Sequence, residues 1–207
     1  MTTKRTDPKP AKPRVPVRER LLATAGDLFY NEGIHAVGID RVLAEAGVAK
    51  ASLYDSFGSK EALVAAYLSS RQEARVERVQ GIVDAAPDAR AALLGIFASI
   101  GAQITAPAYR GCAFAKAGIE AEPGSQVRAV CDDARQWMLD LFGRLARQAG
   151  AAEPDALARQ LLTVYDGTAL AAHLDRASGQ LPAIAAAAHD TAALLLDRYL
   201  PSEHKRP

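Results

Sequence analysis

Hydrophobic residues recur along most of this chain at the three- and four-residue spacing of amphipathic helices. Separate stripes of this kind run over residues 21–29, 39–43, 48–57, 63–83, 93–104, 127–145, 157–174 and 184–199. Strict alternation of apolar and polar residues over the length of a strand occurs nowhere, and alanine is abundant. The pattern therefore predicts an all-α protein with about nine helices.

Glycine, serine and proline mark the boundaries of these predicted helices. Gly33, Gly47 and Gly58 each follow a stripe, as is typical of residues that end a helix. Ser59 predicts the N-cap of the long fourth helix, because its hydroxyl can accept a hydrogen bond from a first-turn N–H. Prolines at positions 87, 154 and 182 stand where the first turns of later helices are expected.

The character of the helices changes near residue 70. Three short helices precede this point, whereas the helices after it are long and rich in alanine. We therefore expect a small N-terminal domain over residues 17–70, joined through the fourth helix to a larger domain over residues 71–200. A flexible arm over residues 1–16 and a tail over residues 201–207 would flank them.

The net charge of +1 conceals a strongly basic N-terminal arm. Prolines at positions 8, 10, 13 and 16 exclude a regular helix before about residue 17. Flexible basic arms often bind nucleic acid, although a solvated terminus without a partner would have the same composition. The basic residues of the first twenty positions, opposed only by Asp7 and Glu19, are Lys4, Arg5, Lys9, Lys12, Arg14, Arg18 and Arg20.

The sequence "AGVAK" separates the second and third predicted helices, which is typical of a helix-turn-helix. Val48 and Leu53 would hold the third helix against the second. Small and polar residues would then point outward, which lets a helix enter the major groove of DNA without a clash. The alternative is an ordinary helical corner with a solvated face. The residues expected to point outward are Lys50, Ala51, Ser52, Tyr54, Asp55 and Ser56.

The segment "GIDRVLAEAGVAKASLYDSFGSKEALVAAYL" resembles the DNA-binding domain of the TetR family of transcriptional regulators. The matching elements are "LFYNEGIHAVGID" at the end of the first helix, the "AGV" turn, the "LY" pair, Phe57 and "SKEAL" at the start of the fourth helix. The resemblance covers about residues 17–70, and residues 38–57 correspond to the helix-turn-helix itself.

The resemblance implies a homodimeric, ligand-responsive regulator, usually a repressor, that binds a palindromic operator in double-stranded DNA. By this resemblance, the outward-pointing residues of the third helix would form the recognition surface for DNA. These residues are Lys50, Ala51, Ser52, Tyr54, Asp55 and Ser56. The family's phosphate-contacting role passes to Tyr54 and Lys60, which have the reach and chemistry for phosphate oxygens.

Two positions depart from the family's pattern. Gly38 stands where many members have a threonine or serine cap, so one cap or phosphate contact would be missing. Asp55 stands where a neutral or basic residue is frequent. An acid is unfavourable near phosphates, so Asp55 either accepts from a cytosine amino group or points away from the DNA.

The resemblance also implies that the C-terminal helices form a ligand pocket and a dimer interface. The last two long helices, about residues 154–176 and 183–199, are rich in alanine and leucine. A pair from each subunit would make a four-helix bundle, although the same stripes could simply close the monomer core.

Several residues of the larger domain are candidates for lining a pocket for a small organic effector. Each of them alone also fits an ordinary core position. Cys112 lies in "YRGCAFAKAGIEAEPG", which resembles a "GC" stretch of one subgroup of the family, and it is either a redox or electrophile sensor or a small buried apolar residue. The candidates are Phe97, Cys112, Phe114, Trp137, Met138, Tyr165 and His173.

Other classes of protein find little support in the sequence. No nucleophile elbow, phosphate loop, zinc-protease helix or dinucleotide-binding glycine motif occurs, so the alternatives of an all-α enzyme or a protein-binding adaptor rest on no motif. Two cysteines do not make a disulfide framework or a zinc site, and we expect no metal and no cofactor.

The uncharged stretch over residues 91–109 is long enough to span a membrane, but it contains glycine, serine, glutamine and proline. We therefore do not expect a membrane-spanning helix there. No signal peptide opens the chain, and we expect a cytoplasmic protein.

Overall fold

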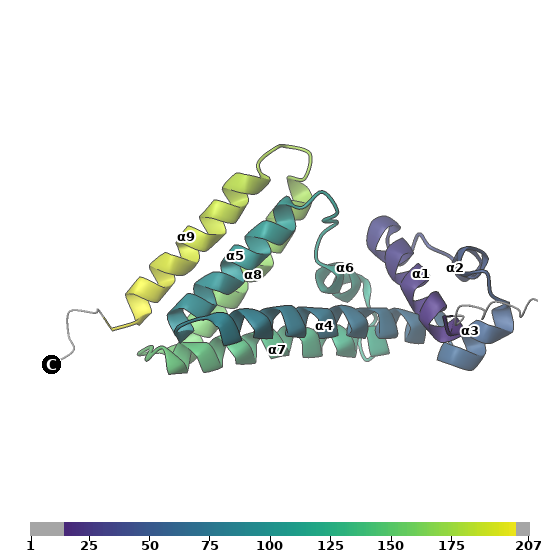
Figure 1. The fold of residues 1–207 in the computed structure, drawn as a ribbon, viewed down its shortest axis with the longest axis horizontal. Helices are drawn as coiled ribbons and strands as arrows, with labels where there is room; N and C mark the ends of the chain where they lie inside the picture. Colours follow the sequence, from purple (N-terminus) through teal and green to yellow (C-terminus); the bar gives the residue numbers. More distant parts are fainter. Residues whose placement is uncertain (1–14, 202–207) are drawn as a thin grey trace, which may run out of the picture.

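The computed structural model describes residues 15–201, which form α-helices and no strand (Figure 1). The all-α prediction is therefore confirmed for this part of the chain. The arm predicted for residues 1–16 and the tail predicted for residues 201–207 lie almost wholly outside it. The helices are α1 (Val17–Glu32), α2 (Ile39–Ala46), α3 (Lys50–Phe57), α4 (Lys60–Ala85), α5 (Ala89–Thr105), α6 (Ala113–Glu120), α7 (Gln126–Gln148), α8 (Pro154–Leu174) and α9 (Leu181–Tyr199).

The helix α6 follows no hydrophobic stripe recognised in the sequence. Its buried face consists of Ala113 and Ala117, while Ile119 is 81% exposed. Alanine gives little contrast between a buried and an exposed face, and eight residues make only two turns. The helix α6 is therefore not predictable from its own sequence, and only its packing against α4 and α7 identifies its buried face.

The long helix α4 connects the two ends of the molecule. It has 26 residues and begins beside α3, as Figure 1 shows, and it reaches the C-terminal helices at its other end. The Ser59 side chain accepts a hydrogen bond from the Ala62 N–H at 3.0 Å, which confirms the predicted N-cap. The helix α4 is therefore a continuous connection between α3 and the C-terminal helices.

Buried apolar residues form two clusters along α4. The N-terminal cluster packs α1, α2 and α3 around Leu53, Leu63 and Leu68, and it extends into α6 and α7 through Ala117 and Cys131. The C-terminal cluster fills the space between α5, α7, α8 and α9. Aromatic rings lie at its centre: Phe97 stacks on Phe142 with centroids 6.0 Å apart, and Tyr165 packs edge-on against both.

Candidate functional site

The helices α2 and α3 form a tight corner at one end of the molecule (Figure 1). Gly47 makes the corner possible, because its backbone is left-handed with φ 62° and its N–H bonds to the end of α2. Leu53 is fully buried, so it fixes the inward face of α3. Lys50, Tyr54 and Asp55 are exposed on the opposite side.

Four of the six α3 residues expected to point outward are exposed, namely Lys50, Ala51, Tyr54 and Asp55. Ala51 is exposed like its neighbours, whereas Ser52 and Ser56 are half-buried at the flanks of the face. Tyr54 is 48% exposed, which leaves its hydroxyl free to reach outward. Lys50 Nζ lies 3.7 Å from the Asp40 carboxylate, an exposed pair of little energetic weight.

Lys60 has a structural contact that the sequence did not predict. Its ammonium donates to the Ile34 carbonyl at 2.8 Å, which anchors the loop between α1 and α2 to the start of α4. Partial burial lowers the pKa of Lys60. An ammonium has three donors, so this hydrogen bond leaves others for a phosphate.

Arg18 is a further cation at the α3 end of the molecule. Its guanidinium carbon lies 4.9 Å from the centre of the Phe57 ring, so the first turn of α1 stands beside α3. The sequence placed Arg18 only among the charges of the N-terminal arm. Its contact depends on how α1 crosses α3, which no local pattern predicts.

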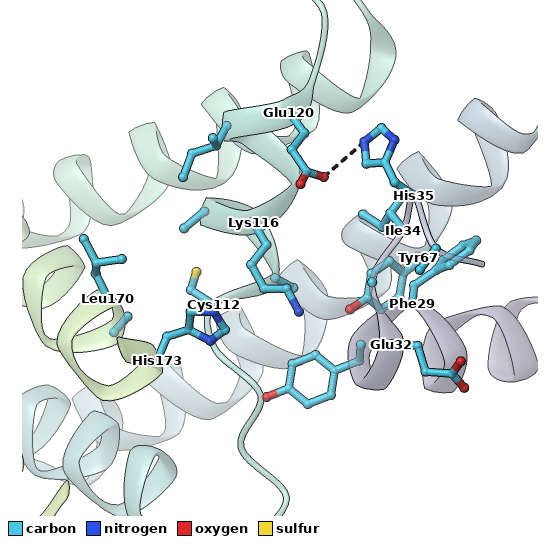
Figure 2. A pocket seen from close by; sticks show the side chains of 17 residues that line it. Phe29, Glu32, Ile34, His35, Tyr67, Cys112, Lys116, Glu120, Leu170 and His173 are labelled. Carbon is cyan, nitrogen blue, oxygen red and sulfur yellow. Dashed lines mark ion pairs between the residues drawn. The ribbon is translucent and has the colours of Figure 1, made fainter. Parts of the chain in front are cut away.

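A pocket of about 430 Å³ lies between α1, α6 and α8, and we call it the α6 pocket (Figure 2). Lys116 projects into it from α6, and Cys112 at the start of α6 and His173 of α8 also line it. His35 Nε2 and Glu120 Oε2 lie 3.0 Å apart at its rim and join the loop after α1 to the end of α6.

A second pocket of about 360 Å³ lies between α4, α5, the loop before α6, and α8, and we call it the arginine pocket. Arg71, Arg75 and Arg78 line it from one face of α4, opposite Tyr109 and Tyr165. Burial raises the pKa of both tyrosines, so their hydroxyls stay neutral donors and acceptors.

Both pockets reach the N-terminal helices through Tyr30 of α1. The Tyr30 hydroxyl accepts a hydrogen bond from the Arg110 N–H at 3.0 Å, and Arg71 lies over the Tyr30 ring at 4.2 Å. The position of α1 is thus physically connected to the walls of both pockets.

Comparisons with known proteins agree with this architecture. The family described as "Bacterial regulatory proteins, tetR family" matches residues 21–67. A TetR-family transcriptional regulator from Streptomyces coelicolor has a solved structure that is 34% identical, with a TM-score of 0.83 over 88% of this chain and 95% of that one.

The chain belongs to the TetR family. Its membership confirms the predicted class, a DNA-binding transcriptional regulator. The TetR-family regulator CifR, in a cysteine-substituted form complexed with 26-bp operator DNA, is 25% identical with a TM-score of 0.72 over 86% of this chain and 98% of that one. The HTH-type transcriptional regulator LmrA of Bacillus subtilis is 24% identical over 67% of this chain and 76% of its own length.

Only some of the residues that were predicted to line an effector pocket line either pocket of this TetR-family chain. Cys112, Phe114 and Tyr165 line the arginine pocket, and Cys112 and His173 line the α6 pocket. Phe97 and Met138 line neither, because both are fully buried in the C-terminal cluster. Trp137 lines neither as well, although its ring centre is 6.0 Å from the Arg75 guanidinium carbon.

The arginines of the arginine pocket were not among the residues predicted from the sequence to line a pocket. Arg71, Arg75 and Arg78 follow the i, i+4, i+7 spacing that places residues on one face of a helix. Basic residues at that spacing are usually solvated, and nothing local distinguishes the buried Arg75 from its exposed neighbours. The packing of α6 and α7 over α4 makes the difference.

Two further observations concern the described residues, 15–201. No group of three or more histidine, cysteine, aspartate or glutamate side chains in this part of the chain is placed to hold a metal ion. No helix within it is both long enough and apolar enough to cross a membrane.

Proposed function

We propose that this TetR-family regulator is a homodimeric, cytoplasmic repressor that leaves its operator when a small organic molecule occupies the pockets between α4, α6 and α8. The observation that carries the proposal is the position of Tyr30, a residue of α1 that lines both pockets. A ligand that moves Tyr30 moves a helix packed against α3.

The proposed DNA contacts follow from the exposed face of α3. The helix enters the major groove with Lys50, Ala51, Ser52, Tyr54, Asp55 and Ser56 toward the bases and backbone. Tyr54 and Lys60 bind phosphates, and Arg18 adds charge at the same end. The basic arm over residues 1–16 adds further affinity that depends on salt.

The proposed dimer uses one exposed stripe on each of α8 and α9. On α8 the stripe contains Gly167, Leu170 and Leu174, of which the leucines are 53% and 73% exposed. On α9 it contains Ala183, Ala187 and Leu194, the last 70% exposed. Small residues let helices approach closely, so two copies would form a four-helix bundle.

The proposed response is a change in the spacing of the recognition helices. In a dimer these helices must lie about 34 Å apart to enter successive major grooves. A ligand that binds better when the spacing is wrong weakens DNA binding by the same factor, and a coupling of about 1–3 kcal/mol is usual. The rigid α4 transmits the change from the pockets to α3.

The test starts by sequencing the DNA fragments that the purified protein retains from its own genome. A shared palindrome would define the operator, and small organic compounds could then be tested for its release. A protein that retains no specific fragment would contradict the proposal at its first step. Operator binding that no compound weakens would contradict the proposed response.

A matched pair of variants tests the coupling through Tyr30. Tyr30→Phe removes the acceptor of the Arg110 N–H but keeps the ring beneath Arg71. Tyr199→Phe removes a phenol that accepts from Gln160 Nε2 at 2.9 Å at the far end of the molecule. We expect the first variant to bind the operator but respond less to an effector, and the second to respond like the parent.

A further inference from the structure

Arg75 is a buried cation that forms no ion pair with a carboxylate of residues 15–201. Its side chain lies on α4 and only 8% of the residue's surface is exposed. Its Nε donates to Gln72 Oε1 at 2.9 Å and its Nη2 to the Ala134 carbonyl at 2.7 Å, both neutral acceptors. Phe114 stacks on the guanidinium at 4.4 Å. An arginine remains charged in proteins, so this positive charge lacks a direct ion-pair partner among the described residues, although the nearby Asp166 carboxylate, which pairs with Arg135, favours it electrostatically.

The neighbouring arginines add to this charge. Arg71 and Arg78 are exposed and line the same pocket. Among residues 15–201, no carboxylate lies within the 4.0 Å ion-pair distance of Arg71, Arg75 or Arg78. The arginine pocket thus combines three cations with aromatic walls and a volume of about 360 Å³.

We propose that the arginine pocket binds a small organic carboxylate with an apolar or aromatic body, and that this anion is the effector. The carboxylate accepts hydrogen bonds from Arg75, whose Nη1 makes no hydrogen bond to the described residues, and from Arg71 or Arg78 at the mouth. The planar guanidinium matches a carboxylate in geometry. The body of the ligand lies between Phe114, Tyr109 and Tyr165.

The same site explains how the anion would act on α1. Arg71 lies over the Tyr30 ring in the free protein. A carboxylate that attracts Arg71 removes this cation from Tyr30 and loosens the contact between α1 and α4. The inference rests on the proposed function only for this last step, because the binding site itself follows from the charges.

The test compares acids with their neutral amides. Phenylacetate, benzoate and hexanoate are titrated against phenylacetamide, benzamide and hexanamide, with the fluorescence of Trp137 as the signal. Trp137 is the only tryptophan and lines neither pocket, but its ring centre lies 6.0 Å from the Arg75 guanidinium carbon, so its fluorescence reports a change at Arg75. We expect at least one acid to bind about tenfold or more tighter than its amide, as a charge-assisted hydrogen bond implies.

Variants then locate the preference for the acid. Arg75→Met should remove it, Arg75→Lys should keep part of it, and Arg144→Met on the exposed face of α7 should keep all of it. If Arg75→Met does not fold, the double variant Arg71→Met, Arg78→Met at exposed positions should still weaken the preference. Equal affinity for acids and amides, a preference that survives Arg75→Met, or binding by none of the acids at millimolar concentration would overturn the proposal.

Operator release is measured in parallel, so the two proposals fail separately. Acids that bind through Arg75 without releasing the operator would support the anion site and contradict its role as the effector site, whereas the ligand-released repressor would be contradicted only if no compound weakened operator binding. Release by a neutral compound, with no preference for acids, would support the repressor and overturn the anion site.

Discussion

Tyr67 shows how much a single buried group contributes to this fold. Its ring packs edge-on against Phe29 with centroids 5.8 Å apart, and only 3% of its surface is exposed. Its hydroxyl is buried and has no hydrogen-bond partner among the described residues. Burial raises the pKa of Tyr67 to about 12. The ring therefore stabilises the N-terminal cluster, while the hydroxyl costs free energy.

The variant Tyr67→Phe keeps the ring and removes that cost. We expect stability at pH 7 to be unchanged or higher by up to about 1–2 kcal/mol, because an unpaired buried hydroxyl is lost. In the parent protein, the unfolded chain ionises Tyr67 near pH 10 and the folded chain near pH 12, so stability falls as the pH rises between these values.

Urea unfolding at pH 8 and pH 11 measures both effects. The fall in stability between these pH values should be smaller in Tyr67→Phe than in the parent, although Tyr109 and Tyr165, whose pKa values burial also raises, leave part of it. An equal fall in both proteins would contradict the assignment of the alkaline loss to Tyr67.

Replacing Tyr54 and replacing Lys60 are expected to have different effects on DNA affinity and on protein stability. Tyr54→Phe removes an exposed hydroxyl and should weaken binding to all DNA sequences alike, with no change in stability. Lys60→Ala should weaken DNA binding, reduce the salt slope by about one unit, and lower stability by about 1 kcal/mol because the Ile34 carbonyl loses its donor. Salt-dependent binding and thermal unfolding separate these effects. A changed sequence preference in either variant would refute a phosphate role.

At the scale of elements, glycines at two helix positions have opposite roles. Gly47 ends α2 with φ 62°, a conformation that costs other L-residues about 1–2 kcal/mol. Gly81 lies inside α4, where a Cβ would meet nothing within 4 Å. Glycine inside a helix costs about 0.5–1 kcal/mol relative to alanine. The corner between α2 and α3 needs its glycine, and the C-terminal part of α4 does not.

The pair Gly47→Ala and Gly81→Ala tests this difference with the same chemical change. We expect the first to lower the free energy of unfolding by about 1–2 kcal/mol and to weaken DNA binding, because α3 loses its angle to α2. The second should raise it by about 0.5–1 kcal/mol. Thermal unfolding of both variants measures these changes. An equal loss of stability in both would show that the α2–α3 corner does not require glycine.

At the scale of the whole molecule, dimerisation decides whether two recognition helices can bind one operator. The α8 stripe begins at Gly167, and a Cβ there would meet nothing within 4 Å in the single chain. A large side chain at this position therefore fits a monomer. It would not fit between two closely packed helices of a dimer.

The variant Gly167→Arg should therefore fold and remain monomeric, whereas Gly81→Arg on α4 should remain dimeric. Light scattering after size exclusion measures the mass of each at micromolar concentration. The monomer should also lose most of its operator affinity, because one recognition helix contacts only one half-site. A dimer of unchanged stability in Gly167→Arg would place the interface on another face.

The hydrophobic pattern by itself determined which segments other than α6 are helical and where the α2–α3 corner lies, because both depend on residues near one another in the chain. The spacing of apolar residues, Ser59 and Gly47 are local signals. The outward face of α3 followed as well, since burying Leu53 leaves only one side for Tyr54 and Lys50.

The tertiary structure alone decided the walls of the pockets and the environment of individual charges. The aromatic residues Phe97 and Phe142 stack within the core, although their chemistry equally suits a pocket wall. Arg75 became a buried cation only because α6 and α7 cover it, while Arg71 and Arg78 on the same helix face stay exposed. Burial of a side chain is set by elements distant in sequence, and the pattern of a single helix does not contain that information.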